Sequence, residues 1–109
     1  MSKILLVEDD ALLLDVMHNI LEAEGFEIHP ASNGKQALDL FVSLKPDLIV
    51  SDIMMPEMDG YELLELIRVM PNGVTVPFLF LSARTERSDV SRARVLGVDD
   101  YLFKPFEAQ

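Results

Sequence analysis

Short apolar runs alternate along this chain with longer segments in which apolar residues recur at helical spacing. The short runs are typical of buried strands. They cover residues 4–7, 48–51, 76–82 and 101–103. A weaker run at 26–32 contains Pro30, which cannot donate a hydrogen bond to a neighbouring strand. We therefore expect five strands, with the 26–32 strand nearer an edge of the sheet.

Helices are predicted between the strands. The first follows the candidate N-caps Asp9 and Asp10 and stops at Gly25. Its central apolar stripe is predicted from the helical spacing of four residues: Leu13, Val16, Met17 and Ile20. After a turn signal at Asn33-Gly34, three further helices are expected: one that ends before Lys45, one after the turn at 56–60, and one at 88–96.

The alternation of strands and helices predicts an α/β fold. Strands that alternate with helices imply right-handed crossovers and a parallel sheet. The central runs are apolar on both faces, which strands need when helices cover both faces of the sheet. In such sheets the working site lies at the carboxyl ends of the strands, so the chemistry of this protein is expected there.

Composition narrows the class of protein. The chain has 109 residues, 50% of them hydrophobic, which suits one domain with one core. No apolar run approaches the roughly 18 residues of a membrane span. The start of the chain lacks the long apolar region of a signal peptide, so we expect a cytoplasmic protein. The absence of cysteine excludes disulfides, thiolate metal sites and cysteine catalysis.

The charge balance bears on the partners. Nine basic against 19 acidic side chains give a net charge of -10. Such a domain repels phosphate backbones and anionic membranes. We therefore expect no direct contact with nucleic acid and no membrane partner.

Polar side chains stand where the predicted strands end. They are Glu8, Asp9 and Asp10 after the first strand, Asp52 after the third, Ser82 at the end of the fourth and Lys104 after the fifth. Crowded carboxylates repel one another unless a cation joins them. Magnesium (Mg2+) takes oxygen ligands and is typically held by one or two carboxylates plus a phosphate. Such a site suits phosphoryl transfer, in which a carboxylate can be the nucleophile. Asp10 is more simply explained as a helix cap.

Four stretches carry a family resemblance. In this order, LLVEDD, SDIMMPEMDG, FLSAR and GVDDYLFKPF resemble the receiver domain of two-component response regulators, over residues 3–106. The resemblance implies a three-layer, doubly wound, flavodoxin-like sheet of five parallel strands in the order 2-1-3-4-5. It also implies signal transduction by phosphorelay: the domain accepts a phosphoryl group from a sensor histidine kinase or phosphotransfer protein and then switches an output or partner surface. A domain of this kind assists its own phosphorylation and dephosphorylation and has no separate substrate.

The resemblance assigns the nucleophile and the metal site. It makes Asp52 the phosphoacceptor. Glu8 and Asp9 become the acidic pair that holds Mg2+ beside Asp52, Asp9 directly and Glu8 largely through water. The backbone carbonyl of Met54 completes the metal shell, so the Met54 side chain need not bind.

The resemblance also assigns the groups around the phosphoryl group. Ser82 and Lys104 contact it once it is present, and Ser82 with Tyr101 forms the switch that alters the partner surface. Met54 and Arg84 flank the approach of water to the phosphorus. They are therefore expected to set the lifetime of the phosphorylated state.

Three other functions are compatible with the sequence. One is a magnesium-dependent phosphatase that works through an aspartyl-phosphate, although Ile53 and Met54 stand where such chemistry usually has a second acid. Another is a flavodoxin-like binding module, although the acidic loop after the first strand suits a flavin phosphate poorly. A receiver that has lost phosphorylation and only docks partners is the third.

We expect residues 1–109 to form one receiver domain that is one helix short. After YLFKPF the family continues into a fifth helix, whereas only Glu107, Ala108 and Gln109 remain here. We expect the natural protein to continue past Gln109. These residues alone are expected either to form a homodimer through the uncovered face or to be marginally stable.

Overall fold

The computed structural model of this chain describes residues 2–83 and 100–104. Four parallel strands lie in the order β2-β1-β3-β4, with bounds β1 (Lys3–Val7), β2 (Glu27–Ala31), β3 (Leu48–Asp52) and β4 (Phe78–Ala83). The backbone of β5 (Asp100–Lys104) pairs in parallel with β4. The predicted α/β class and the predicted order of the first four strands are confirmed. As expected, β2, with its Pro30, lies at the edge.

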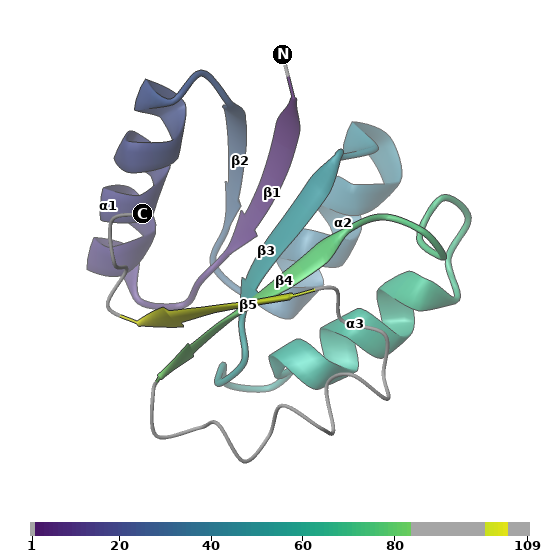
Figure 1. Ribbon diagram of the computed structural model, residues 1–109. Coiled ribbons are helices and arrows are strands. Elements are labelled where there is room, and N and C mark those ends of the chain that lie inside the picture. Colours follow the sequence, from purple (N-terminus) through teal and green to yellow (C-terminus); the bar gives the residue numbers. More distant parts are fainter. Residues whose placement is uncertain (1, 84–99, 105–109) are drawn as a thin grey trace.

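Helices cover both faces of this sheet. α1 (Ala11–Ala23) lies on one side, and α2 (Gly34–Leu44) and α3 (Gly60–Arg68) lie on the other (Figure 1). The three layers follow from the strands, whose alternate side chains point to opposite faces and are buried on both. The predicted helix at 88–96 and the expected fifth helix lie outside the described residues.

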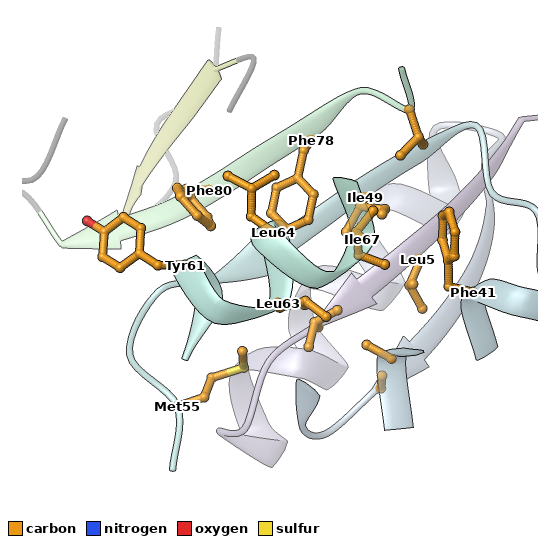
Figure 2. Close-up of a cluster of buried hydrophobic side chains, with 14 of the residues drawn as sticks. Leu5, Phe41, Ile49, Met55, Tyr61, Leu63, Leu64, Ile67, Phe78 and Phe80 are labelled. Atoms are coloured by element: carbon orange, nitrogen blue, oxygen red, sulfur yellow. The ribbon is translucent and has the colours of Figure 1, made fainter. Parts of the chain in front are cut away.

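The side chains form two cores, one on each face. The larger core lies between the sheet and the pair α2 and α3 (Figure 2). In it the Phe80 ring makes edge-to-face contacts with Tyr61 and Phe78, at centroid distances of 5.3 and 5.4 Å. The smaller core lies under α1 and is built from these buried residues: Ile4, Leu6, Met17, Ile28, Val50 and Leu81. Together the two cores fix the ends of β1 and β3 in place.

The stripe predicted for α1 is half right: Leu13 and Met17 pack on the sheet, whereas Val16 and Ile20 face away from it. Val16 and Ile20 are 44% and 50% exposed, whereas Met17 is 1% exposed. The residues that pack with Met17 on the sheet are Leu13, Leu14 and Leu21. The N-terminal half of α1 is apolar on nearly every side, so several stripes have helical spacing. The position of the helix over β1 and β2 decides which one is buried.

Side-chain caps begin all three described helices. The Asp10 carboxylate accepts hydrogen bonds from the N–H groups of Leu12 and Leu13, at 3.0 and 3.2 Å. Asn33 caps α2, so the predicted turn at Asn33-Gly34 is in fact a helix start. Asp59 and Glu62 form a capping box at α3. These caps fix where each helix begins. None of the helices in the described part of the chain is long and apolar enough to cross a membrane.

Candidate functional site

The carboxyl ends of β1 and β3 bring three carboxylates together. Val7 and Ser51 are partners in the parallel ladder, so the next residues, Glu8 and Asp52, emerge side by side. One oxygen each of Glu8, Asp9 and Asp52 lies within 4.8 Å of the others. Glu8 and Asp52 are buried, at 1% and 6% exposure, while Asp9 is exposed. The structure therefore joins the three acids that the sequence analysis placed in one site.

Backbone groups orient Glu8. Its own N–H donates to the Ala31 carbonyl at 3.0 Å and extends the pairing of β1 with β2 by one residue. Its Oε2 accepts a hydrogen bond from the Asp10 N–H at 3.1 Å. The Asp10 side chain serves α1 as its N-cap, which confirms its predicted role as a cap.

Asp52 is held by the chain that follows it. The Ile53 N–H donates to Asp52 Oδ1 at 2.9 Å, and the Ser51 hydroxyl donates to the Asp52 carbonyl at 2.9 Å. One residue of α3 also reaches this turn, because the Gly60 N–H donates to the Ile53 carbonyl at 2.7 Å. The carboxylate thus stands on a backbone turn that strand β3 and helix α3 hold from two sides.

The donor set fits a hard divalent cation. All three side chains offer carboxylate oxygens, which are the ligands that Mg2+ prefers. Two Mg2+ ligands on opposite sides of the ion lie about 4.2 Å apart, since each bond is about 2.1 Å long. The three oxygens lie within 4.8 Å of one another, slightly more than this span, so a small movement of the side chains or a bridging water would bring all three to one ion. A cation would also offset the repulsion between two buried carboxylates.

The backbone puts several of the other predicted site residues at or near the same edge of the sheet. Met54 follows Asp52 in the next loop, and its side chain is 64% exposed. The backbone places Ser82 near the end of β4 and Lys104 at the end of β5, while Tyr101 is the β5 partner of Phe80. Their side-chain roles remain predictions. Arg84 lies outside the described residues.

Two residues at this site were not singled out from the sequence. Ser51 is 0% exposed and contacts the Asp52 carbonyl. Gly60 is the first residue of α3, and a Cβ atom there would lie 2.5 Å from the Asp52 carbonyl oxygen. Ser51 had a signal in the sequence, because it is the polar residue between the apolar run and the functional aspartate. Gly60 had no comparable signal, because the sequence showed only that it stands at the end of a predicted turn.

The histidines lie elsewhere. His18 pairs with Glu22 on α1, and the His29 ring contacts the Glu27 carboxylate on the edge strand β2. The hydrogen bond from His29 lowers the pKa of Glu27 below its ordinary value. Both pairs lie outside the acidic cluster that contains Asp52.

Comparison with known proteins shows the family. The family model of the response regulator receiver domain matches residues 4–109, and this chain belongs to that family of two-component signalling domains. It is 40% identical over 114 residues to the alkaline phosphatase synthesis transcriptional regulatory protein SphR of Synechococcus elongatus. That match covers 96% of this chain but 44% of SphR, so the chain spans less than half of that relative.

Solved structures agree with this assignment. The fold matches the chemotaxis protein CheY4 of Vibrio cholerae with a TM-score of 0.93 at 29% identity, over 98% of this chain and 89% of CheY4. It matches the receiver domain of sensor histidine kinase PA1611 from Pseudomonas aeruginosa PAO1 with a TM-score of 0.88 at 33% identity, over 97% and 87% of the two chains. The PA1611 structure has a magnesium ion coordinated in the active site cleft. The resemblance inferred from the four sequence motifs is confirmed.

Proposed function

We propose that Asp52 accepts a phosphoryl group from a sensor histidine kinase or phosphotransfer protein in a reaction that depends on Mg2+. The observation that carries this proposal is the buried Asp52 carboxylate at the end of β3, with Glu8 and Asp9 oxygens within 4.8 Å. An Asp52 oxygen forms a bond to phosphorus while the bond from phosphorus to the donor breaks. With a phosphohistidine donor the imidazole nitrogen leaves, and with acetyl phosphate the acetate leaves.

Glu8, Asp9 and the Met54 carbonyl, with Asp52 itself, are the groups that would hold Mg2+. The bound ion supplies positive charge that offsets the charge on the phosphoryl oxygens. Glu8 is fixed by the Asp10 N–H, so its carboxylate is oriented before any ion arrives. Asp9 is exposed and is the acid best placed to meet an ion from solvent. The magnesium ion in the PA1611 receiver domain supports this proposal by analogy.

The remaining roles belong to the same proposal. Ser82 and Lys104 bind the phosphoryl oxygens, and the complete sheet has the receiver order 2-1-3-4-5, which the pairing of β4 with β5 supports. Ser82 and Tyr101 couple phosphorylation to the partner surface. Met54, which is exposed beside the site, and Arg84 limit the approach of water and prolong the phosphorylated state.

The chain acts as a phosphoacceptor and not as an enzyme with its own substrate. A phosphatase of this kind usually has a second acid, separate from the metal ligands, just after the nucleophile to activate water, and here the next two residues are Ile53, which is buried, and Met54, which is apolar. The net charge of -10 supports a domain that does not itself contact DNA. Turnover of an added phosphomonoester would contradict this part of the proposal.

The test is phosphorylation by a small donor. With acetyl phosphate and Mg2+, the protein is expected to gain one phosphoryl group that hydroxylamine removes, since acyl phosphates react with hydroxylamine. Without Mg2+ the gain should be negligible. Intact mass spectrometry before and after hydroxylamine measures both. Labelling that is equally fast in a metal chelator, or that survives hydroxylamine, would contradict the proposal.

Replacing Asp9 with asparagine is expected to weaken this labelling far more than the same change at Asp10. Asp9→Asn removes a charged metal ligand. Loss of an outer partner of a metal ligand alone costs about 10–100-fold in affinity, so the Mg2+ concentration for half-maximal labelling should rise by at least about tenfold. Asp10→Asn keeps an oxygen that can cap α1, and its labelling should stay within about twofold of wild type.

Titrating Mg2+ at fixed acetyl phosphate gives the half-maximal concentration for each variant. The two substitutions make the same change in charge at adjacent positions, so each is the control for the other. An equal loss from both would mean that the net charge of the loop matters, and that Asp9 has no special role.

A further inference from the structure

The peptide group between Asp52 and Ile53 is held at both of its ends. Its carbonyl oxygen accepts a hydrogen bond from the Ser51 hydroxyl, and its N–H donates to Asp52 Oδ1, both at 2.9 Å. A peptide group is planar and rigid, so a contact that fixes the carbonyl also fixes the direction of the N–H. The orientation of the Asp52 carboxylate is therefore tied to the Ser51 hydroxyl through one rigid unit.

Ser51 is a polar residue in an apolar place. It is 0% exposed and follows Ile49 and Val50, which are exposed by 0% and 3%. Strands covered on both faces are usually apolar throughout, and a buried hydroxyl is costly unless it is hydrogen-bonded. The hydroxyl at this position bonds to the backbone of Asp52, and packing alone gives no reason for it.

Helix α3 lies against this peptide group and is hydrogen-bonded to the next one. The Gly60 N–H donates to the Ile53 carbonyl at 2.7 Å. A Cβ atom on Gly60 would lie 2.5 Å from the Asp52 carbonyl oxygen and 2.9 Å from Ile53 Cα, so the glycine backbone is in close contact with the turn. The Asp52 carbonyl thus accepts a hydrogen bond from Ser51 and lies close to the backbone of Gly60. These two contacts leave the peptide group little freedom to tilt.

We propose that Ser51 and Gly60 are positioning residues for the Asp52 carboxylate. They clamp the Asp52–Ile53 peptide group, and its N–H holds Oδ1 in the orientation that phosphoryl transfer uses. Neither residue contacts the phosphoryl donor, because both act through the backbone of the turn. The inference rests on the proposed function of Asp52 as the phosphoacceptor.

The sharpest test compares Ser51→Val with Ser51→Thr. The two side chains have nearly the same shape and both suit a strand, but only threonine keeps the hydroxyl. Any strain from the added methyl group is therefore common to the pair. Ser51→Val should be phosphorylated by acetyl phosphate roughly threefold to tenfold more slowly than Ser51→Thr, which is the range expected for one hydrogen bond.

A second readout separates positioning from stability. The amide proton of Ile53, observed by NMR, reports its hydrogen bond to Asp52 Oδ1. Its chemical shift should move in Ser51→Val and return toward the wild-type value in Ser51→Thr. Rates are compared per folded molecule, well below the melting temperature of each variant, so that a loss of stability alone does not change them.

Several outcomes would overturn the inference. The first is an equal rate of phosphorylation in the valine and threonine variants, and the second is the same Ile53 amide chemical shift in both. The third is a valine variant that melts at a lower temperature but is otherwise unchanged in rate and chemical shift. If neither larger side chain allows folding, Ser51→Ala against wild type replaces the pair. A slower rate and a moved Ile53 shift then support the inference, and unchanged values refute it. If wild type itself gains no phosphoryl group, the proposed function fails, while the Ile53 shift still tests the clamp.

Discussion

Replacing Asp52 with alanine or asparagine is expected to reduce Mg2+-dependent phosphorylation to background. Asp52 supplies the attacking oxygen, and neither a methyl group nor a neutral amide replaces it as a nucleophile. Asparagine matches aspartate in shape, and its oxygen can still accept from the Ile53 N–H, as Oδ1 does in the wild type. Asp52→Asn therefore tests the chemistry with the fold retained, and Asp52→Ala serves as the more drastic second variant.

Asp52→Asn should also stabilise the protein when no metal is present. Asp52 and Glu8 are buried carboxylates, and with Asp9 they bring three acidic oxygens within 4.8 Å of one another. Two like charges at this distance repel by about 1 kcal/mol with the dielectric constant of bulk water and by about 3 kcal/mol with the lower value that applies near a protein surface, so the range is about 1–3 kcal/mol. Removing one charge should raise the free energy of unfolding in a chelator by about that amount. Added Mg2+ should stabilise wild type more than Asp52→Asn, so the difference in free energy of unfolding between the two proteins should become smaller.

Intact mass after reaction with acetyl phosphate measures the first effect, and thermal melting with and without Mg2+ measures the second. Asp10→Asn is the matched control, because it removes a charge from the same edge of the sheet while the α1 cap can remain. Labelling of Asp52→Asn at the wild-type level would show that another residue accepts the phosphoryl group. An Asp52→Asn variant that is less stable than wild type in chelator would contradict the repulsion argument.

The sequence contained most of the site because its residues follow strands. Asp52 and the pair Glu8 and Asp9 come at the ends of predicted strands, and parallel strands bring their carboxyl ends to one edge. Position along the chain was therefore enough to place these acids together. The role of Asp10 was also predictable, since an acid directly before a helix is a preferred cap.

Other features depend on distances that no sequence pattern reports. Two of the four residues predicted for the buried stripe of α1, Val16 and Ile20, are exposed, because apolar residues surround most of that helix. Only the position of α1 on β1 and β2 decides that Leu14 packs on the core in place of Val16. The closeness of Gly60 to Asp52 arises where α3 begins against the end of β3. The bond between the Ser51 hydroxyl and the neighbouring carbonyl likewise depends on the shape of the turn.

Replacing Gly60 with alanine is expected to destabilise the fold strongly and to slow phosphorylation. The new Cβ would lie 2.5 Å from the Asp52 carbonyl oxygen, 2.9 Å from Ile53 Cα and 3.0 Å from a Phe80 ring carbon. Two of these atoms belong to the backbone, so they can move only if the end of β3 moves. Overpacking of this kind costs about 1–3 kcal/mol and occasionally more. We expect the upper part of that range, because the displaced backbone is also the one that carries the nucleophile.

Gly34 is the matched control for Gly60. It is likewise the first residue of a helix and likewise follows a side-chain cap, Asn33 in place of Asp59. A Cβ at Gly34 would meet Met58 alone among its nearest atoms, at 2.6 Å from Sδ. Methionine has three rotatable bonds, so its side chain can move aside. Gly34→Ala should therefore cost less than about 1 kcal/mol.

Thermal melting separates the two glycine variants. For a domain of about this size, 1 kcal/mol corresponds to roughly 4 °C or more in melting temperature. Gly60→Ala should therefore melt about 10 °C or more below Gly34→Ala. At a temperature where both variants are folded, only Gly60→Ala should be phosphorylated more slowly than wild type, because only that substitution displaces the backbone of Asp52. Melting temperatures within a few degrees of each other would mean that the turn yields easily to a methyl group. The close contact between α3 and the phosphoacceptor would then have little effect on the stability of the fold.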